Sequence, residues 1–313
     1  MDTQAPGEIP DSLRALMADI GPRWAASVPA NVRKMVDGFT PVLARVPKQG
    51  VEVTRDLRYG EHARHQLDIY ALRKDAPQPV VVFLHGGAFV DGERNRSSEI
   101  YANVLYFFAR HGVIGVNLEY RLAPEFQYPS GIEDVALAVA WVRTHIAGFG
   151  GDSARIFLAG HSAGAAHAAG YAYDERHHPA DGSGLAGLIV LSGRVRADNS
   201  ADNPNARKVE AYYGADATCY DDRSPVSRVN AASIRTMVAF AEYENPLLDI
   251  YCLELSYRLA AAKRKAPRVL RLAGHNHTSL IAHINTNEDW LGREMLAFVG
   301  ESSGQQRSRD HSP

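Results

Sequence analysis

Two short apolar runs constrain the fold of this chain most strongly. Val80–Leu84 and Leu185–Leu191 are almost uninterrupted by polar side chains, which is typical of strands buried on both faces of a parallel sheet. Six more strand-like runs are present, and helix-like runs lie between several of them. This alternation predicts an α/β architecture, with a central, mostly parallel eight-stranded sheet and helices on both faces.

The remaining elements are placed by the same patterns. The other strands are expected at Val51–Leu57, Gln66–Ala71, Val113–Leu118, Arg155–Ala159, Ile234–Ala241 and Arg268–Leu272. Helices are expected at Ser97–Arg110, Gly131–Ile146, Ser162–Glu175, Leu248–Lys265 and Thr278–Val299. No helix pattern separates the first two strands, so we expect them to form an antiparallel edge of the sheet.

Three segments do not follow the alternation of strands and helices: residues 1–48, about 194–232 and 301–313. Residues 1–48 contain helix patterns and prolines at 22, 29, 41 and 47, and we expect them to form a helical cap segment over one end of the sheet. Residues 49–300 are then the α/β domain, and its long polar stretch at about 194–232 is expected to be loop that adds a small cap contribution. Residues 301–313 are polar and predict a disordered tail.

Composition excludes several classes of function. The formal net charge of -2 argues against a nucleic-acid-binding face, and no apolar run approaches the ~20 residues that span a bilayer. No signal-peptide pattern is visible, so a cytoplasmic protein is expected. Cys219 and Cys252 fit neither a disulfide framework nor a metal motif, and we interpret both as small buried hydrophobes. No metal and no organic cofactor is expected.

A candidate nucleophile lies in the pentapeptide Gly160-His-Ser-Ala-Gly164. It has the form G-x-S-x-G, and it stands between a predicted strand and an Ala-rich helix pattern. A serine on such a sharp turn projects its hydroxyl above the sheet edge, and the crowding there requires small flanking residues. Ser162 is therefore predicted to be a nucleophile.

The stretch His85-Gly-Gly-Ala-Phe89 follows the buried strand Val80–Leu84. Glycines allow backbone N–H groups to approach a ligand without an intervening Cβ. The oxyanion of an acyl-transfer intermediate needs two or three such fixed donors. The expected donors are the N–H groups of Gly86, Gly87 and Ala163.

A serine nucleophile needs a base, and the base is oriented by an acid. The loop after the last strand offers His277, which is preferred because it immediately precedes a helix pattern, with His275 as the alternative. The acid is expected after Ile234–Ala241, and Glu244 is preferred there. Glu242 and Asp249 are the other carboxylates of this stretch.

Together these motifs resemble those of the α/β-hydrolase superfamily, and most of all the hormone-sensitive-lipase-like esterases and the kynurenine-formamidase-like branch. The residues that carry the resemblance are His85–Phe89, Tyr120-Arg-Leu-Ala-Pro-Glu125, Gly160–Gly164 and Gly274-His-Asn-His277. The match covers about residues 50–300. It implies an α/β-hydrolase fold with a small helical cap and a Ser–acid–His triad, for which the order Ser162, Glu244, His277 is suitable.

Two departures from the family pattern bear on the site. Ala88 replaces the usual third glycine but still supplies an N–H. The lipase-like acid motif Asp-Pro-Leu-x-Asp reads Asn245-Pro-Leu-Leu-Asp249 here. The formamidase-like branch places its acid one residue earlier, and this alignment selects Glu244, because an amide cannot stabilise an imidazolium as a carboxylate does.

Several residues near the motifs are candidates for substrate recognition. Phe89, His161 and Arg194 are the candidate substrate-binding residues, although His161, as the variable residue before the serine, is expected to point away from the reacting group. Arg94, Arg96 and Arg196 are further candidates for holding a substrate carboxylate. Tyr212 and Tyr213 are expected either to line an apolar acyl or aryl pocket or to belong to the core.

The preferred hypothesis is a serine carboxylesterase that cleaves short-chain or aryl esters. The alternative is an arylformamidase or amidase, and a remote alternative is a non-catalytic hydrolase fold that binds a ligand. The expected partner is a small-molecule ester or amide, with no nucleic acid and no membrane. The sequence leaves a homodimer open.

Overall fold

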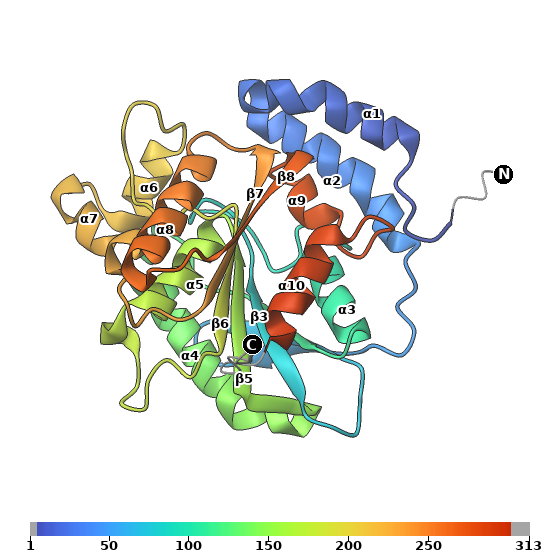
Figure 1. Ribbon diagram of the computed structural model, residues 1–313, viewed down its shortest axis with the longest axis horizontal. Coiled ribbons are helices and arrows are strands. Elements are labelled where there is room, and N and C mark those ends of the chain that lie inside the picture. Colours follow the sequence, from blue (N-terminus) through green and yellow to red (C-terminus); the bar gives the residue numbers. More distant parts are fainter. Residues whose placement is uncertain (1–4, 302–313) are drawn as a thin grey trace, which may run out of the picture.

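The computed structural model describes residues 5–301. Eight strands form one sheet in the order β1-β2-β4-β3-β5-β6-β7-β8 (Figure 1). Their bounds are β1 Glu52–Arg58, β2 Gln66–Ala71, β3 Gln78–Leu84, β4 Ile114–Leu118, β5 Gly151–His161, β6 Gly187–Leu191, β7 Thr236–Tyr243 and β8 Arg268–Asn276. β2 runs antiparallel to both β1 and β4, and the other pairs are parallel. The predicted sheet with an antiparallel edge is confirmed.

The central strand β3 shows why the apolar runs are uninterrupted. Its alternating side chains are all buried from Val80 onward, and they enter two different cores. Val81 and Phe83 lie in one core, whereas Val80, Val82 and Leu84 lie in the other. A parallel strand that is covered on both faces needs apolar residues at successive positions.

Helices cover both faces of the sheet (Figure 1). On one face lie α4 Ser130–His145, α5 Ala163–Tyr173 and α8 Leu248–Lys263, and on the other lie α3 Ala102–Arg110 and α10 Trp290–Gly300. The predicted single helix Thr278–Val299 is wrong, because it is divided into α9 Ser279–Ala282 and α10. Asn285 takes a left-handed φ of 70° after α9. The side-chain amide of Asn103 donates to the carbonyl oxygens of Ile281 and Ile284, which stabilises this break.

The N-terminal helices lie over one end of the sheet (Figure 1). They are α1 Asp11–Ile20, the 3₁₀ segment η1 Gly21–Ser27 and α2 Val28–Ala44. Their buried side chains, among them Trp24, Met35 and Phe39, join the same core as Leu272 of β8 and Leu280 of α9. The division of the chain into cap segment and α/β domain stays a prediction. Of the expected tail at residues 301–313, all but Glu301 lies outside the described residues.

The stretch at 194–232 differs from the expected loop. It contains α6 Ala206–Tyr213, η4 Ala217–Cys219, α7 Tyr220–Arg223 and η5 Pro225–Arg228. Val209, Tyr212, Tyr213, Tyr220 and Val226 are at most 5% exposed and anchor these short helices to the body of the protein. These buried residues are separated by polar ones along the chain, so the sequence pattern did not predict that they pack on the same side.

The prediction that both cysteines are buried is confirmed for Cys252 and is wrong for Cys219. Cys252 is fully buried, whereas Cys219 is partly exposed, and both are free thiols.

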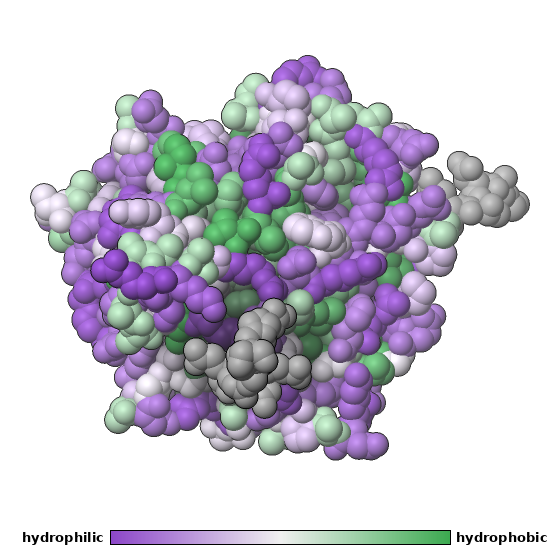
Figure 2. Space-filling view, in the orientation of Figure 1, coloured by the Kyte–Doolittle hydropathy of each residue, from purple (hydrophilic) through white to green (hydrophobic). Residues whose placement is uncertain are grey.

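The face of the molecule shown in Figure 2 is mostly hydrophilic. Apolar residues gather on the face shown in Figure 2, around β8 between α8 and α10. Ile250, Leu253 and Tyr257 of α8 and Val269 of β8 are exposed large apolar residues. Among residues 5–301, no helix combines the length and the apolar character that crossing a membrane requires.

Candidate active site

Ser162 stands on a sharp turn between β5 and α5. Its backbone has φ 57° and ψ -117°, a conformation that costs a non-glycine residue on the order of 1–3 kcal/mol. The neighbouring strand β6 and the loop after it hold this conformation in place. Ser162 N–H donates to Leu191 O at 2.9 Å, and Arg194 N–H donates to Ser162 O at 3.0 Å. Close packing explains the flanking glycines, since a Cβ at Gly164 would lie 2.3 Å from His85 O.

The loop that begins at His85 lies beside this turn. Gly87 has φ 154°, and a Cβ there would lie 1.6 Å from Asp91 O, so only glycine fits. The Tyr120–Glu125 motif holds the loop: Tyr120 Oη donates to His85 O at 2.6 Å, and Ala123 N–H donates to Phe89 O at 3.0 Å. The loop His85–Phe89 and the segment Tyr120–Glu125 are therefore joined by hydrogen bonds into one unit.

His277 and Glu244 form a hydrogen-bonded pair. His277 Nδ1 lies 2.6 Å from Glu244 Oε2, and both side chains are almost completely buried. The second carboxylate oxygen, Oε1, accepts from Ala241 N–H at 2.8 Å and from the Ser192 hydroxyl. Because the carboxylate is held from β7 and from the loop after β6, it fixes the orientation of the imidazole. A carboxylate acceptor at Nδ1 leaves Nε2 free to act as a base.

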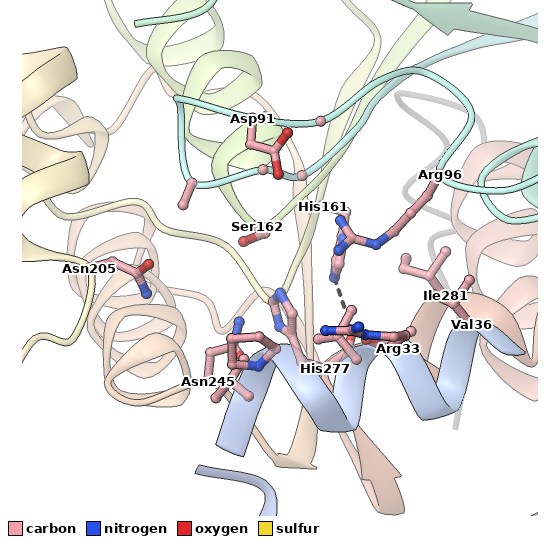
Figure 3. A pocket seen from close by; sticks show the side chains of 18 of the residues that line it. Arg33, Val36, Asp91, Arg96, His161, Ser162, Asn205, Asn245, His277 and Ile281 are labelled. Atoms are coloured by element: carbon pink, nitrogen blue, oxygen red, sulfur yellow. Dashed lines mark hydrogen bonds between the residues drawn. The ribbon is translucent and has the colours of Figure 1, made fainter. Parts of the chain in front are cut away.

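The other candidates for the acid and the base are engaged elsewhere. Glu242 accepts from Gly274 N–H and pairs with Arg271, and within the described structure Asp249 has no hydrogen bond to His277. His275 Nδ1 lies 3.2 Å from Ser279 Oγ, and the His275 ring packs against His283. The structure thus joins Glu244, rather than Glu242 or Asp249, to His277, and it is His277, not His275, that lines the pocket containing Ser162 (Figure 3).

Asn245, where the lipase-like alignment expects an aspartate, has a structural partner. Its side-chain oxygen accepts a hydrogen bond of 2.8 Å from the indole N–H of Trp24 in η1. Trp24 is 1% exposed. The amide therefore joins the N-terminal helices to the loop that carries Glu244, a role that sequence reasoning did not predict.

His161 connects the base to the loop that carries Gly86. Its Nε2 lies 3.1 Å from His277 O, and its Nδ1 lies 3.1 Å from Tyr101 Oη. A carbonyl oxygen only accepts, so Nε2 carries the hydrogen and Nδ1 accepts from the tyrosine hydroxyl. Burial, followed by the nearby His277, holds the pKa of His161 well below its ordinary value, so the ring is neutral. Tyr101 Oη in turn accepts from Gly86 N–H at 3.1 Å.

This chain of hydrogen bonds changes the expectation for Gly86. Its N–H, predicted to be an oxyanion donor, is already directed at Tyr101. Among the described residues, no acceptor is found for the N–H groups of Gly87 and Ala88. Gly87 N–H therefore stays a predicted oxyanion donor, and Ala88 N–H, which also has no acceptor in the described part of the chain, replaces Gly86 N–H in the prediction. Ala163 is the first residue of α5, where N–H groups lack a partner within the helix.

Ser162, His277 and the glycine loop line a pocket of about 910 Å³ (Figure 3). Its walls come from α2 and the segment before it, from the loop 86–96, and from the loops after β6, β7 and β8. Arg33 and Val36 place α2 directly at the site, which gives the N-terminal helices a part in shaping it (Figure 3). The pocket lies at the carboxyl ends of the parallel strands, where open α/β sheets bind ligands.

Phe89 does not lie on the pocket wall, contrary to expectation. Positive φ angles of 51° at Ala88 and 73° at Phe89 turn the loop, and the ring stacks on Tyr212 with centroids 4.8 Å apart and an interplanar angle of 8°. Phe89 is 1% exposed and joins Tyr212 and Tyr213 in a small core cluster. Of the two alternatives for these tyrosines, the structure places them in the core.

The four arginine candidates divide into two groups. Arg94 pairs with Asp56 and Asp68, and Arg196 pairs with Glu254 and Asp221, so both are structural. Arg96 and Arg194 line the pocket.

The described residues contain no group of three or more His, Cys, Asp or Glu side chains arranged to hold a metal ion.

Comparison with solved structures identifies this architecture. The hyperthermophilic esterase from Pyrobaculum calidifontis superimposes with a TM-score of 0.67 over 93% of this chain and 96% of its own, at 20% sequence identity. The chain has the α/β-hydrolase fold. A family model described as BD-FAE matches residues 67–215 of the chain, which include the nucleophile turn and the glycine loop.

Curated relatives extend the similarity to sequence. The esterase LipC of Mycobacterium tuberculosis is 28% identical over 241 residues, covering 71% of this chain and 59% of LipC. The gibberellin receptor GID1 of Oryza sativa subsp. japonica is 34% identical over 174 residues, covering 50% of this chain and 48% of the receptor. The chain thus spans less than two thirds of the length of these relatives. The matches confirm the resemblance to esterases that the motifs predicted.

Proposed function

We propose that this α/β-hydrolase is a serine carboxylesterase in which Ser162 is the nucleophile, His277 the base and Glu244 the acid. The hydrogen bond between Glu244 Oε2 and His277 Nδ1 carries the proposal, because it orients the imidazole in the pocket that also contains Ser162. A buried carboxylate at Nδ1 fixes the tautomer that can accept a proton at Nε2.

The chemistry follows in two halves. Ser162 Oγ attacks the ester carbonyl carbon while its proton passes to His277 Nε2, and a tetrahedral oxyanion forms. The C–O bond to the alcohol breaks, and the alcohol leaves with the proton from Nε2. Water then attacks the acyl-enzyme in the same way, and the carboxylic acid leaves with Ser162 restored.

The oxyanion would be stabilised by backbone donors on both sides of Ser162. Gly87, Ala88 and Ala163 supply N–H groups, and removal of one such donor costs roughly 3–4 kcal/mol of transition-state stabilisation. Gly86 contributes indirectly, because its hydrogen bond to Tyr101 holds the loop in position.

Short-chain or aryl esters are the proposed substrates. The pocket volume of about 910 Å³ is within the range of small-molecule sites. Relatives named as carboxylesterases and methylesterases support an ester as the reacting group. An aryl formamide is the second candidate, favoured by the position of Glu244 immediately before Asn245-Pro246, as in the formamidase-like alignment.

The similarity to a hormone receptor keeps a non-catalytic ligand-binding role as a third candidate. A binding module has no need of a carboxylate and an imidazole held together next to a serine. The Glu244–His277 hydrogen bond therefore argues for catalysis.

The test compares p-nitrophenyl esters of increasing acyl length with N-formyl anilides. We expect the wild-type protein to have a higher kcat/KM for short-chain esters, and Ser162→Ala to abolish turnover. Higher kcat/KM for the anilides would favour the formamidase. Absence of turnover together with absence of labelling by a fluorophosphonate would leave the binding role.

A further inference from the structure

Arg194 is a buried cation with few partners on the wall of the candidate active site. It is 1% exposed, and it lines the pocket. In the described part of the chain its Nε has no hydrogen-bond partner, and Nη1 makes one long contact of 3.5 Å with Asn203 Oδ1. Within residues 5–301, no carboxylate lies within ion-pair distance of this guanidinium. The guanidinium has five N–H donors, and the one acceptor found for them among the described residues is the distant Asn203 Oδ1.

Other partly buried arginines of the chain have several hydrogen-bond acceptors around the guanidinium. Arg64 donates to Tyr120 O, Gly92 O and the Glu119 carboxylate. Arg121 donates to the Asp134 carboxylate and to Ser130 O. Arg194 has no comparable set of acceptors, although it is more deeply buried than either. Burial of a charge without a counterion is unfavourable, and burial lowers the pKa of the Arg194 guanidinium.

The backbone places Arg194 next to the reacting group. Its N–H donates to Ser162 O, so its Cα lies one hydrogen bond away from the nucleophile residue. It lies two residues after Ser192, whose hydroxyl donates to Glu244. Ser162 and Arg194 line the same pocket of about 910 Å³, so one small molecule with an ester and an anionic group can contact both residues.

The rest of the pocket wall supports an anion. Four cationic side chains line it, namely Arg33, Arg96, Arg194 and Lys208, against the two carboxylates Asp91 and Glu93. In the part of the chain that the structure describes, none of these four cations forms an ion pair. Arg33 and Arg96 reach the site from α2 and from the loop 86–96, respectively (Figure 3).

We propose that Arg194 is a substrate-binding residue that holds a carboxylate on the substrate, so that this enzyme acts on monoesters of acids that carry a second, free carboxylate, or on esters of carboxylate-bearing alcohols. The proposal rests on the serine esterase function above. A carboxylate accepts two parallel N–H bonds from one guanidinium, and it neutralises the buried charge.

The experiment uses pairs of esters that differ only in charge. Methyl hydrogen adipate is compared with methyl 5-carbamoylpentanoate for an acyl-side carboxylate, and 4-acetoxybenzoate with 4-acetoxybenzamide for an alcohol-side carboxylate. In at least one pair we expect the acid to have the higher kcat/KM by about 30-fold or more, as for a charge-assisted pair of hydrogen bonds.

Substitution then assigns the preference to Arg194. Arg194→Gln should reduce the acid-to-amide ratio to near unity, whereas Arg194→Lys, which keeps the charge in a similar space, should retain part of it. The matched control is Arg207→Gln on the exposed face of α6, outside the pocket lining, which should leave the ratio unchanged. Equal losses for acid and amide in Arg194→Gln would mean that Arg194 only supports Glu244, and would overturn the proposal.

A binding measurement separates this inference from the esterase function. Calorimetry on Ser162→Ala should detect the acid of the preferred pair and bind its amide much more weakly, and the additional Arg194→Gln change should remove that difference. If Ser162 is acylated and neutral esters are cleaved but the wild type shows no preference for acids, only the carboxylate proposal fails. If no ester is cleaved and calorimetry still shows the Arg194-dependent difference, the esterase function fails and the carboxylate site stands.

Discussion

Glu244 Oε2 lies 2.6 Å from His277 Nδ1, although the two residues are 33 positions apart in the sequence. Glu244 comes from the end of β7 and His277 from the loop after β8, and the parallel pairing of these strands brings both to the same edge of the sheet. The main-chain bond from His277 N–H to Tyr243 O fixes their relative position further. The orientation of the base is therefore set by the sheet itself.

Removing the charge of Glu244 should impair catalysis without removing the fold. Glu244→Gln leaves an amide at Nδ1, which can stabilise the wrong tautomer and cannot stabilise imidazolium. We expect kcat to fall by roughly 10³- to 10⁴-fold. Asp249→Asn and Glu242→Gln are the controls, and steady-state kinetics on a p-nitrophenyl ester is the measurement. A larger loss in Asp249→Asn than in Glu244→Gln would show that the acid is wrongly assigned.

The two histidines of the last loop should behave differently. His277→Ala removes the base and should reduce kcat by about 10⁴-fold or more. His275→Ala removes a ring that packs on His283 outside the pocket lining, so most turnover should remain. The same kinetic assay distinguishes them, and the reverse order of effects would move the base to His275.

Tyr101 should act as a positioning residue. Tyr101→Phe leaves Gly86 N–H and His161 Nδ1 without their shared partner, and a buried unpaired group costs about 1–3 kcal/mol. We expect a lower kcat with little change in KM, because the loop of oxyanion donors and the base loop are both affected. Tyr106→Phe in α3 is the matched control. Unchanged kcat in Tyr101→Phe would show that the chain of hydrogen bonds has no part in turnover.

Stability should decline in acid because several histidines are buried. Burial lowers the pKa of His167 and of His283 to about 3, and that of His161 also falls well below 6.5. Between pH 6.5 and about 3 the unfolded chain binds more protons than the native protein. The free energy of unfolding is therefore fully present above pH 6.5 and falls with decreasing pH, by up to about 1.4 kcal/mol per pH unit for each histidine.

Denaturant unfolding at several pH values between 7.5 and 4.5 tests this. His167→Asn should reduce the slope of the free energy of unfolding against pH by the contribution of one bound proton, roughly 1.4 kcal/mol per pH unit. His145→Asn, at an exposed position of α4, should leave the slope unchanged. Identical slopes in wild type and His167→Asn would contradict the prediction.

The sheet could be predicted from sequence because its strands are buried on both faces. A run such as Val80–Leu84 has no other stable environment in a chain of alternating strands and helices. Ser162 could be predicted for a similar reason, since a sharp strand-to-helix turn tolerates only small residues on either side of the serine. Both signals lie within a few consecutive residues.

Features that depend on distant contacts could not be predicted in the same way. The hydrogen bond between Trp24 and Asn245 joins residues 221 positions apart, and nothing in either local sequence indicates it. Phe89 turns into the core because its partner Tyr212 lies there on α6, a helix whose apolar face is formed by only a few residues. Arg194 and Arg196 are two residues apart, yet only the positions of Glu254 and Asp221 reveal which of the two is ion-paired.

The attachment site of an acyl or phosphonyl group tests the central claim most directly. The protein would be treated with a fluorophosphonate and, separately, with a slowly turned-over p-nitrophenyl ester, then digested and examined by mass spectrometry. We predict one adduct, on Ser162, which is abolished in Ser162→Ala and strongly slowed in His277→Ala. An adduct on another residue, or ester hydrolysis that persists in Ser162→Ala, would contradict the account.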